Sequence, residues 1–475
     1  MRFVKGMGFV QDHLPRLHGI GDAVDLQCVM TGIDIHDLRK IVGFSASDPP
    51  VQMQMEHGNN GFHAEKTWKL RSDKVRKRGH KIIPFGTDGA NIISDRIKTF
   101  AASDSIMIIA KGKINVKKGG VFMKKLKMGL IGCGGMMASH AQGVNAVDSV
   151  EIVAVCDIIP ENAKKVAAVL NDPYITTDYT TMVDMVDAVL IALPHDLHYE
   201  CGMFFSKKKK HILMEKPLCN SEEECISLIE TCEAAGVTLM CAYPVRFKPG
   251  IIKLKELVDS GEYGKVIQMS IWTEQLTGED WLNMGKPGWG ATARLGGGQL
   301  FSHGCHYVDL LLWFLGNPVK GCHFGTKVGT PWMMREGTSV LSMTFESGAL
   351  AYHGATWGAR GTRLGYDFQI QMEKAMLEYE LDSNEVRVYN SQGVHKPGVD
   401  DRDNKKYSVV WKQEAGLGKQ TQYEIAHFAE CVRTGATPLT NGWDTLQGLR
   451  VIWKTYEAEK NNTVADLRGL GLKMR

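Results

Sequence analysis

An apolar run that ends in a glycine turn constrains this chain more than any other stretch. Residues 128–131 are short, apolar and bounded by glycine, which predicts a parallel strand buried on both faces. Gly132 and Gly134 permit a tight turn and a close approach of the backbone to a ligand. The residues after Gly135 can begin a helix, whose free N–H groups and dipole favour a phosphate.

A second strand with an acidic end follows this turn. Residues 151–157 predict a strand whose last residue, Asp157, lies about 25 residues beyond the turn, where a dinucleotide-binding unit places a carboxylate for ribose hydroxyls. Met137 occupies the position of the third fingerprint glycine. The combination predicts a nucleotide site, and the alternative is a βαβ unit without a ligand. The residues expected to bind the cofactor here are Gly132, Cys133, Gly134, Gly135, Met136, Met137 and Asp157. Cys133 is more simply a small filler than a reactive thiol.

Composition excludes several classes of protein. The chain has 475 residues, with 44% hydrophobic and 23% charged residues, as in an ordinary globular protein of several domains. A net charge of +3 is too small to predict a nucleic-acid or membrane-surface partner. No apolar run approaches the ~20 residues that span a bilayer. Eleven cysteines without a C-x-x-C pair, and no signal-peptide apolar core, predict reduced thiols in the cytoplasm.

The pattern along the chain predicts three parts. Residues 1–122 form an N-terminal extension of unknown fold and role, with strands expected at 81–85 and 106–110 and a helix at 90–102. Its basic stretch 69–81 is either an anion-binding patch or a solvated face. Residues 123–243 alternate strand and helix, which predicts an α/β domain with a parallel sheet. Residues 244–475 predict an α+β domain with a large, mostly antiparallel sheet.

The individual elements follow from periodicity and turn signals. In the second part, helices are expected at 138–146, 160–171, 198–206 and 222–235, and strands at 187–193, 211–214 and 237–243. In the third part, helices are expected at 249–260, 299–315, 422–434 and 445–459, and strands at 266–274, 338–345, 349–356, 368–372, 375–380, 386–389 and 407–411.

Motifs in this order resemble one family, the glucose–fructose oxidoreductase, inositol dehydrogenase and rhizopine-catabolism (Gfo/Idh/MocA) superfamily. The resemblance covers about three quarters of the chain, from Leu126 to Asp466, and leaves residues 1–122 outside it. It is carried by residues 131–135, 191–198, 215–217, 243–249, 296–309 and 435–438.

The resemblance implies a Rossmann domain followed by a domain whose open sheet makes contacts in a homo-oligomer. It implies nicotinamide-dependent oxidation or reduction of a sugar, polyol or glycoside. The further residues that it places at the cofactor are Leu193, Pro194, His198, Glu215 and Lys216. Because no arginine follows Asp157, a 2′-phosphate would meet an uncompensated carboxylate, which predicts NAD over NADP.

Two residues are expected to carry the chemistry. Lys216, at a strand end, can polarise a reacting hydroxyl, and His306 can accept its proton. The alternatives are a surface ion pair of Lys216 with Glu215 and a core histidine at 306. Ser302 replaces an aspartate that the family often has, so we expect His306 to lack a carboxylate partner and activity to rise from about pH 6 to 8. His303 and His306 have a spacing that can bind a metal, but hydride transfer needs none, and none is predicted.

The substrate residues are expected from both domains. Tryptophan faces stack on sugar C–H groups, and Arg246 and His195 lie at strand ends. The expected substrate-binding residues are His195, Arg246, Trp289, Ser302, His303 and His306. Three functions remain open: an NAD-dependent sugar dehydrogenase, a redox-neutral enzyme that cleaves glycosides by oxidation and elimination, and a non-enzymatic NAD-binding sensor.

Overall fold

The chain forms two compact units, Met1–Gly119 and Gly120–Arg475. The computed structural model describes residues 26–29, 53–57, 66–70, 125–277, 295–390, 406–413 and 419–472. In the first unit, strands β1 (Leu26–Val29), β2 (Met53–His57) and β3 (Lys66–Leu70) form an antiparallel sheet in the order β1-β3-β2. The elements predicted at 81–85, 90–102 and 106–110, and most of the basic stretch 69–81, lie outside the described residues.

The second unit begins with a six-stranded parallel sheet in the order β6-β5-β4-β7-β8-β9. Its strands are β4 (Leu126–Ile131), β5 (Val150–Cys156), β6 (Tyr174–Thr176), β7 (Ala188–Ile191), β8 (His211–Glu215) and β9 (Leu239–Ala242). All neighbouring pairs are parallel, and the strands at the centre are buried along their length because helices cover both faces. This order places the switch in chain direction between β4 and β7, where such sheets bind ligands.

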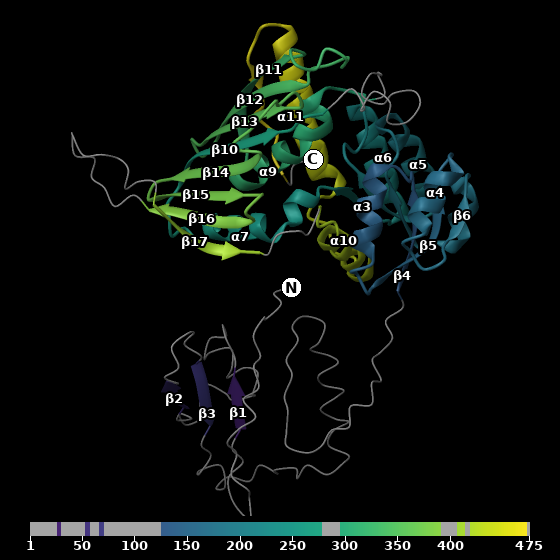
Figure 1. The fold of residues 1–475 in the computed structure, drawn as a ribbon, viewed down its shortest axis with the longest axis horizontal. Coiled ribbons are helices and arrows are strands. Elements are labelled where there is room, and N and C mark those ends of the chain that lie inside the picture. The colour runs from purple at the N-terminus through teal and green to yellow at the C-terminus, as the bar shows by residue number, and fades with distance from the viewer. Residues whose placement is uncertain are drawn as a thin grey trace, which may run out of the picture. The chain divides into compact units, whose positions relative to one another are not determined.

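Four helices cover this sheet. They are α3 (Gly135–Val144), α4 (Pro160–Ala167), α5 (His198–Lys207) and α6 (Glu222–Ala235). Because β4 to β6 and β7 to β9 progress in opposite directions with right-handed crossovers, α3 and α4 lie on one face and α5 and α6 on the other (Figure 1). Helix α3 starts three residues earlier than predicted, directly at the glycine turn.

A nine-stranded sheet follows, in the order β17-β16-β15-β14-β10-β13-β12-β11-β18. Its strands are β10 (Val266–Glu274), β11 (Pro318–Thr326), β12 (Thr338–Phe345), β13 (Leu350–Thr356), β14 (Tyr366–Met372), β15 (Ala375–Glu380), β16 (Glu385–Asn390), β17 (Tyr407–Lys412) and β18 (Ala465–Asp466). Only the described pair β10–β13 is parallel, so the prediction of a mostly antiparallel sheet is confirmed. Strand β11 was not expected from the sequence.

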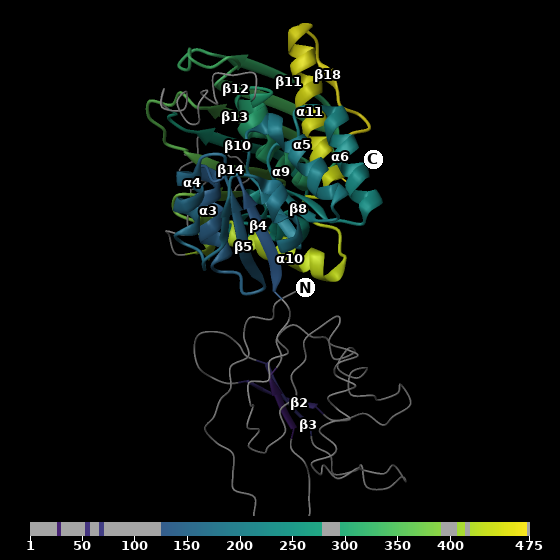
Figure 2. The ribbon, with the colours of Figure 1, turned by 90° about the vertical axis from the view of Figure 1, so that its right-hand side faces the viewer.

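Helices α9 (Cys305–Leu315) and α11 (Gly442–Lys460) lie between the two sheets (Figures 1 and 2). Helix α9 packs on β10 and β13, whereas α11 contacts α6, α9 and β11. Helix α7 (Pro249–Asp259) packs on β15 to β17, and α10 (Gln422–Thr434) packs on α3. Ten of the eleven residues of α9 are buried, because protein surrounds this helix on all sides.

The single helix predicted over 299–315 is two elements. A π-helical turn, Leu300–Gly304, precedes α9. Its start is held by Glu336, whose carboxylate accepts a hydrogen bond from Leu300 N at 3.3 Å. A Cβ at Gly298 would lie 2.1 Å from that carboxyl group, so a larger residue there would displace the Glu336 carboxylate. Such π-helical turns are frequent at functional sites. In the described part of the chain, no helix is both long and apolar enough to cross a bilayer.

Candidate active site

The glycine turn after β4 has the geometry of a nucleotide site. Gly132 has a φ of +83°, and a Cβ there would lie 2.5 Å from Ala192 O, so only glycine fits. A Cβ added at Gly134 or Gly135 would meet no described atom within 4 Å, so the space before the first turn of α3 is open. This open helix start fits a dinucleotide phosphate. The Met137 side chain is 0% exposed in the core, so the expected contact of Met137 with the cofactor falls to its backbone in the first turn of α3 and stays a prediction.

Asp157 ties the end of β5 to this turn. Its carboxylate accepts hydrogen bonds from Cys133 N at 2.7 Å and from Ile159 N at 2.8 Å. The Cys133 thiol is buried and donates to Cys156 O at 3.5 Å. Burial, and next the charge of Asp157, raise the pKa of Cys133 to about 12. The thiol is therefore protonated at neutral pH and acts as the filler that the sequence favoured.

Two buried histidines, His195 and His198, follow β7 and contact backbone carbonyl groups. Both ring nitrogens of His198 face carbonyl oxygens, that of Pro217 at 2.8 Å and that of Leu193 at 2.9 Å. His198 therefore positions the segments that follow β7 and β8 and offers a cofactor no free ring nitrogen. Leu193 and Pro194 are half-buried at the carboxyl end of β7. His195 is 3% exposed, with Nδ1 3.0 Å from Leu295 O, and its expected place at the substrate stays a prediction.

Glu215 belongs to a buried array behind the predicted catalytic lysine. Its carboxylate lies 2.7 Å from His140 Nε2 and accepts from the Lys216 amide at 3.1 Å. Burial raises the pKa of Glu215, but the hydrogen bond to His140 and the nearby cations outweigh it and bring the pKa to about 2. On the other side, His140 Nδ1 lies 3.8 Å from the Glu424 carboxyl. Burial, and next the charge of Glu215, raise the pKa of Glu424 well above its usual range.

Lys216, which follows β8, lies close enough to His306 of α9 for its charge to act on the histidine ring. The Lys216 ammonium donates to Ser302 O at 3.0 Å, so it is not engaged by Glu215 in a surface ion pair. His306 is 7% exposed, its ring centroid lies 5.3 Å from that of Tyr243, and its Nδ1 has no hydrogen-bond partner in the described structure. Burial, and next the charge of Lys216, lower the pKa of His306 well below its usual range.

The state of His306 revises one expectation from the sequence. No carboxylate is among the groups that shift its pKa, which agrees with a serine at position 302. Because the pKa is lowered, the ring is neutral, and able to accept a proton, already below pH 6.5. Activity is therefore not expected to rise between about pH 6 and 8 through titration of His306.

His303 has different surroundings from His306. Its ring centroid lies 5.3 Å from that of Tyr307 and 6.0 Å from that of Tyr366, and Nδ1 lies 3.4 Å from Gln299 Nε2. The rings of His303 and His306 are 5.9 Å apart. Among the described residues, no group of three His, Cys, Asp or Glu side chains is arranged to hold a metal. Ser302 is 1% exposed and contributes its carbonyl oxygen to Lys216.

Arg246 forms a buried ion pair. Its Nη1 donates to Asp309 Oδ1 at 2.9 Å, and both side chains are buried. The guanidinium also lies 4.8 Å from the ring centroid of Trp313. Because α9 supplies the acid that pairs with Arg246, the guanidinium is held in the interior, and its expected contact with substrate stays a prediction. Trp289 lies outside the described residues.

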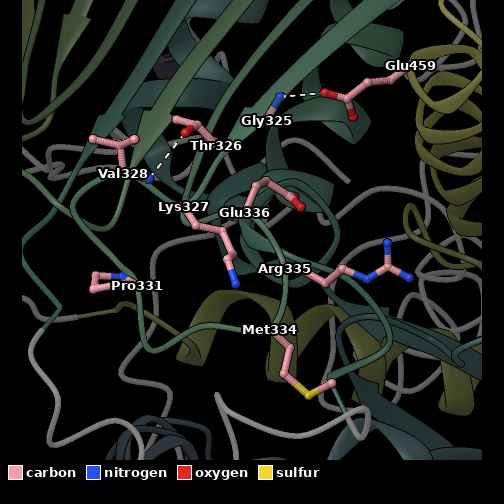
Figure 3. A pocket seen from close by; sticks show the side chains of 9 residues that line it. All are labelled: Gly325, Thr326, Lys327, Val328, Pro331, Met334, Arg335, Glu336 and Glu459. Atoms are coloured by element: carbon pink, nitrogen blue, oxygen red, sulfur yellow. Dashed lines mark hydrogen bonds between the residues drawn. The ribbon is translucent and has the colours of Figure 1, made fainter.

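A surface hollow of about 800 Å³ lies beyond the end of β11 (Figure 3). Its lining residues are Gly325, Thr326, Lys327, Val328, Pro331, Met334, Arg335, Glu336 and Glu459. Its two carboxylates already have donors, since Glu459 accepts from Gly325 N at 2.7 Å and Glu336 accepts from Leu300 N. The lining includes none of the residues predicted to bind cofactor or substrate. The hollow is therefore distinct from the candidate active site.

Sequence reasoning missed four residues of this region, namely Tyr243 beside His306, His140 and Glu424 in the array of Glu215, and Lys419. His140 lies on the helix that follows the glycine turn, so its helical position was a usable signal. The other three reach the site only through contacts between segments far apart in the sequence. Lys419 lies close enough for its charge to lower the pKa of both His303 and His306.

These features define a class of protein. A parallel sheet with a nucleotide turn, joined to an open mixed sheet that contributes a histidine beside a strand-end lysine, is the architecture of a nicotinamide-dependent oxidoreductase. Residues 126–243 match the Gfo/Idh/MocA oxidoreductase family, NAD-binding Rossmann fold, and residues 251–378 match the Gfo/Idh/MocA C-terminal domain. The chain belongs to the Gfo/Idh/MocA family of NAD(P)-dependent oxidoreductases.

Similar proteins of this family differ in activity. The chain is 25% identical over 346 residues to the 2,7-anhydro-N-acetylneuraminate hydratase of Escherichia coli (strain K12), covering 68% of this chain and 90% of the relative. It is 25% identical over 337 residues to the scyllo-inositol 2-dehydrogenase (NAD(+)) of Bacillus subtilis (strain 168), covering 69% and 92%. A levoglucosan dehydrogenase, solved in complex with NADH and levoglucosan, has a TM-score of 0.64 at 19% identity, covering 73% and 100%. That last likeness is one of fold.

Proposed function

We propose that this protein oxidises a secondary hydroxyl group of a sugar, polyol or glycoside to a ketone, with NAD as the hydride acceptor. The proposal is supported by the charge of Lys216, which acts on the buried His306 ring of the second domain, and by the open start of α3 after the glycine turn. We assign residues 123–243 to NAD binding and residues 244–475 to substrate binding and oligomerisation. The role of residues 1–122 stays unassigned.

Residues from both domains take part in the proposed hydride and proton transfer. Bound NAD supplies the hydride acceptor at nicotinamide C4. Lys216 orients and polarises the reacting hydroxyl with its ammonium group. His306, neutral because burial and Lys216 lower its pKa, accepts the hydroxyl proton. Glu215, ionised and hydrogen-bonded to both His140 and the Lys216 amide, holds the backbone from which Lys216 extends.

The residues that follow β5 favour NAD over NADP. Asp157 places a carboxylate there, and the residues that follow it are Ile158 and Ile159, which offer no cation for a 2′-phosphate. Both oxygens of Asp157 already accept backbone hydrogen bonds, which fixes the carboxylate beside the turn.

A second candidate is a redox-neutral reaction in which NAD oxidises the substrate only transiently. The similarity to a hydratase favours keeping this candidate. The purified protein should be incubated with NAD and a panel of sugars, polyols and glycosides, with NADH absorbance and products measured. A dehydrogenase gives NADH and a keto-sugar in equal amounts. An altered or cleaved product without net NADH would support the second candidate, and no reaction with any sugar would contradict both.

We also propose a homo-oligomer that assembles through the nine-stranded sheet. Large apolar side chains are exposed on four of its strands, including Phe324 at 68%, Ile267 at 53%, Leu350 at 49% and Val409 at 46%. Light scattering at micromolar concentration should give a dimer or a larger symmetric assembly. A monomer at that concentration would contradict the proposal.

A further inference from the structure

The start of α10 brings a lysine from late in the chain to the glycine turn. Thr421 Oγ1 donates to Ser139 O of α3 at 3.1 Å. A Cβ at Gly143 would lie 2.1 Å from Thr421 Oγ1, so the two helices approach so closely that only glycine fits. This contact fixes the residues just before α10, and the Lys419 ammonium contacts the Met136 thioether in the first turn of α3.

Lys419 has no anionic partner within the part of the chain that is described. An ammonium carries three N–H donors, and a thioether is a weak acceptor. The nearby Glu215 carboxylate is already hydrogen-bonded by His140 and by a backbone amide. The other nearby acid, Glu424, has its pKa raised by burial. The position of Lys419 therefore favours an anion that comes from outside the chain.

The space beside Lys419 is where such an anion fits. Gly134 and Gly135 have no described atom within 4 Å of an added Cβ, and the free N–H groups of α3 start there. Met136, which the Lys419 ammonium contacts, directly follows Gly135 in the chain, so an anion at this helix start lies near Lys419. The N–H groups of α3 and the Lys419 ammonium thus both favour an anion at the start of α3.

We propose that Lys419 binds the diphosphate of the dinucleotide, so that the late part of the chain completes the cofactor site. This inference rests on the proposed NAD-dependent function. A backbone helix start alone binds phosphate through N–H groups and dipole, whereas Lys419 adds a full charge that salt screens.

Equilibrium titrations with NADH, ADP-ribose and adenosine test this proposal, because only the first two contain a diphosphate. Lys419→Met should raise the Kd for both diphosphate ligands by roughly tenfold or more, as expected for one charge-assisted hydrogen bond, and leave adenosine unchanged. The Kd of the Lys419→Met variant for NADH should also rise less steeply with NaCl concentration than the Kd of the wild type. Lys419→Arg should restore most of the affinity, and Lys320→Met, at an exposed lysine on β11, should have no effect.

Other outcomes would overturn the inference. If Lys419→Met binds both diphosphate ligands normally but raises KM for carboxylate-bearing sugars alone, the anion belongs to the substrate. If adenosine affinity falls by the same factor, Lys419 supports the site as a whole rather than the diphosphate. A wild-type protein that binds neither NADH nor ADP-ribose overturns the proposed function as well, whereas normal wild-type binding with an unaffected Lys419→Met variant overturns only this inference.

Discussion

Replacing Arg246, which is paired with buried Asp309, tests whether Arg246 stabilises the fold or binds the substrate. Burial raises the pKa of Asp309 from its ordinary 3.8 to about 6, with Arg246 opposing the rise. Since one pKa unit corresponds to about 1.4 kcal/mol, ionised Asp309 costs about 3 kcal/mol at this position even beside Arg246. Arg246→Met removes the compensating charge, and breaking a buried pair costs about 3–5 kcal/mol.

Protonation of Asp309 limits that loss. In Arg246→Met, the pKa of Asp309 in the folded state rises further above its value in the unfolded state. The folded variant is therefore most stable at low pH, where Asp309 is neutral, and loses stability as pH rises through the folded-state pKa of Asp309. We expect a loss of about 3 kcal/mol at pH 7, and a smaller loss at pH 5. Because about 1 kcal/mol shifts Tm by roughly 2–4 °C in domains of this size, thermal unfolding should show a drop of roughly 6–12 °C.

Two further variants make this prediction sharp. Arg246→Met with Asp309→Leu should recover most of the stability, because an apolar pair can replace a buried ion pair. Arg450→Met breaks a more exposed pair with Glu222 and should cost about 1 kcal/mol or less. The sugar KM should stay nearly unchanged in the folded Arg246→Met protein. An unchanged Tm with a tenfold higher KM would refute this reasoning and restore Arg246 to the substrate site.

Three further predictions follow from individual side chains. Asp157→Ser should relax the preference for NAD over NADP, and equal wild-type affinity for the two cofactors would contradict the assignment. The acid limb of kcat/KM should lie below pH 6.5, because burial and Lys216 lower the pKa of His306; a limb between pH 7 and 8 would exclude it as the base. Glu424 has a raised folded-state pKa, so its stability contribution is lost as pH rises. Glu424→Gln should therefore raise Tm, relative to the wild type, more at pH 8 than at pH 5, and the same difference at both pH values would contradict this.

The parallel sheet could be predicted because each of its central strands is a short apolar run that is visible in the local sequence. Strands buried on both faces must be apolar along their length, as β7 is, and the turn at Gly132 requires glycine. Strand β11 was missed because Gly321 and Gly325 give it little strand preference, and its place is set by pairing with β12 and β18.

The parts of the site that were missed depend on distant contacts. The π-helical turn at Leu300 is associated with the Glu336 carboxylate, which comes from a separate loop and leaves no periodic trace near residue 300. The partner of Arg246 was not predicted because Asp309 lies 63 positions away. Lys419 and Glu424 reach the cofactor side only because α10 packs on α3. Local pattern therefore predicts strands and turns, whereas side-chain partners depend on the assembled fold.

The most direct test of the central claim is the single-turnover rate of NADH formation with saturating NAD and a sugar that the panel identifies. The account predicts that His306→Ala and Lys216→Ala each lose about 10²–10⁴-fold in this rate, with NAD affinity nearly unchanged. His303→Ala should lose much less, because His303 Nδ1 already faces Gln299 Nε2, whereas His306 Nδ1 has no hydrogen-bond partner in the described structure. Near-normal turnover in His306→Ala, with the loss appearing in His303→Ala instead, would contradict the assignment of the base.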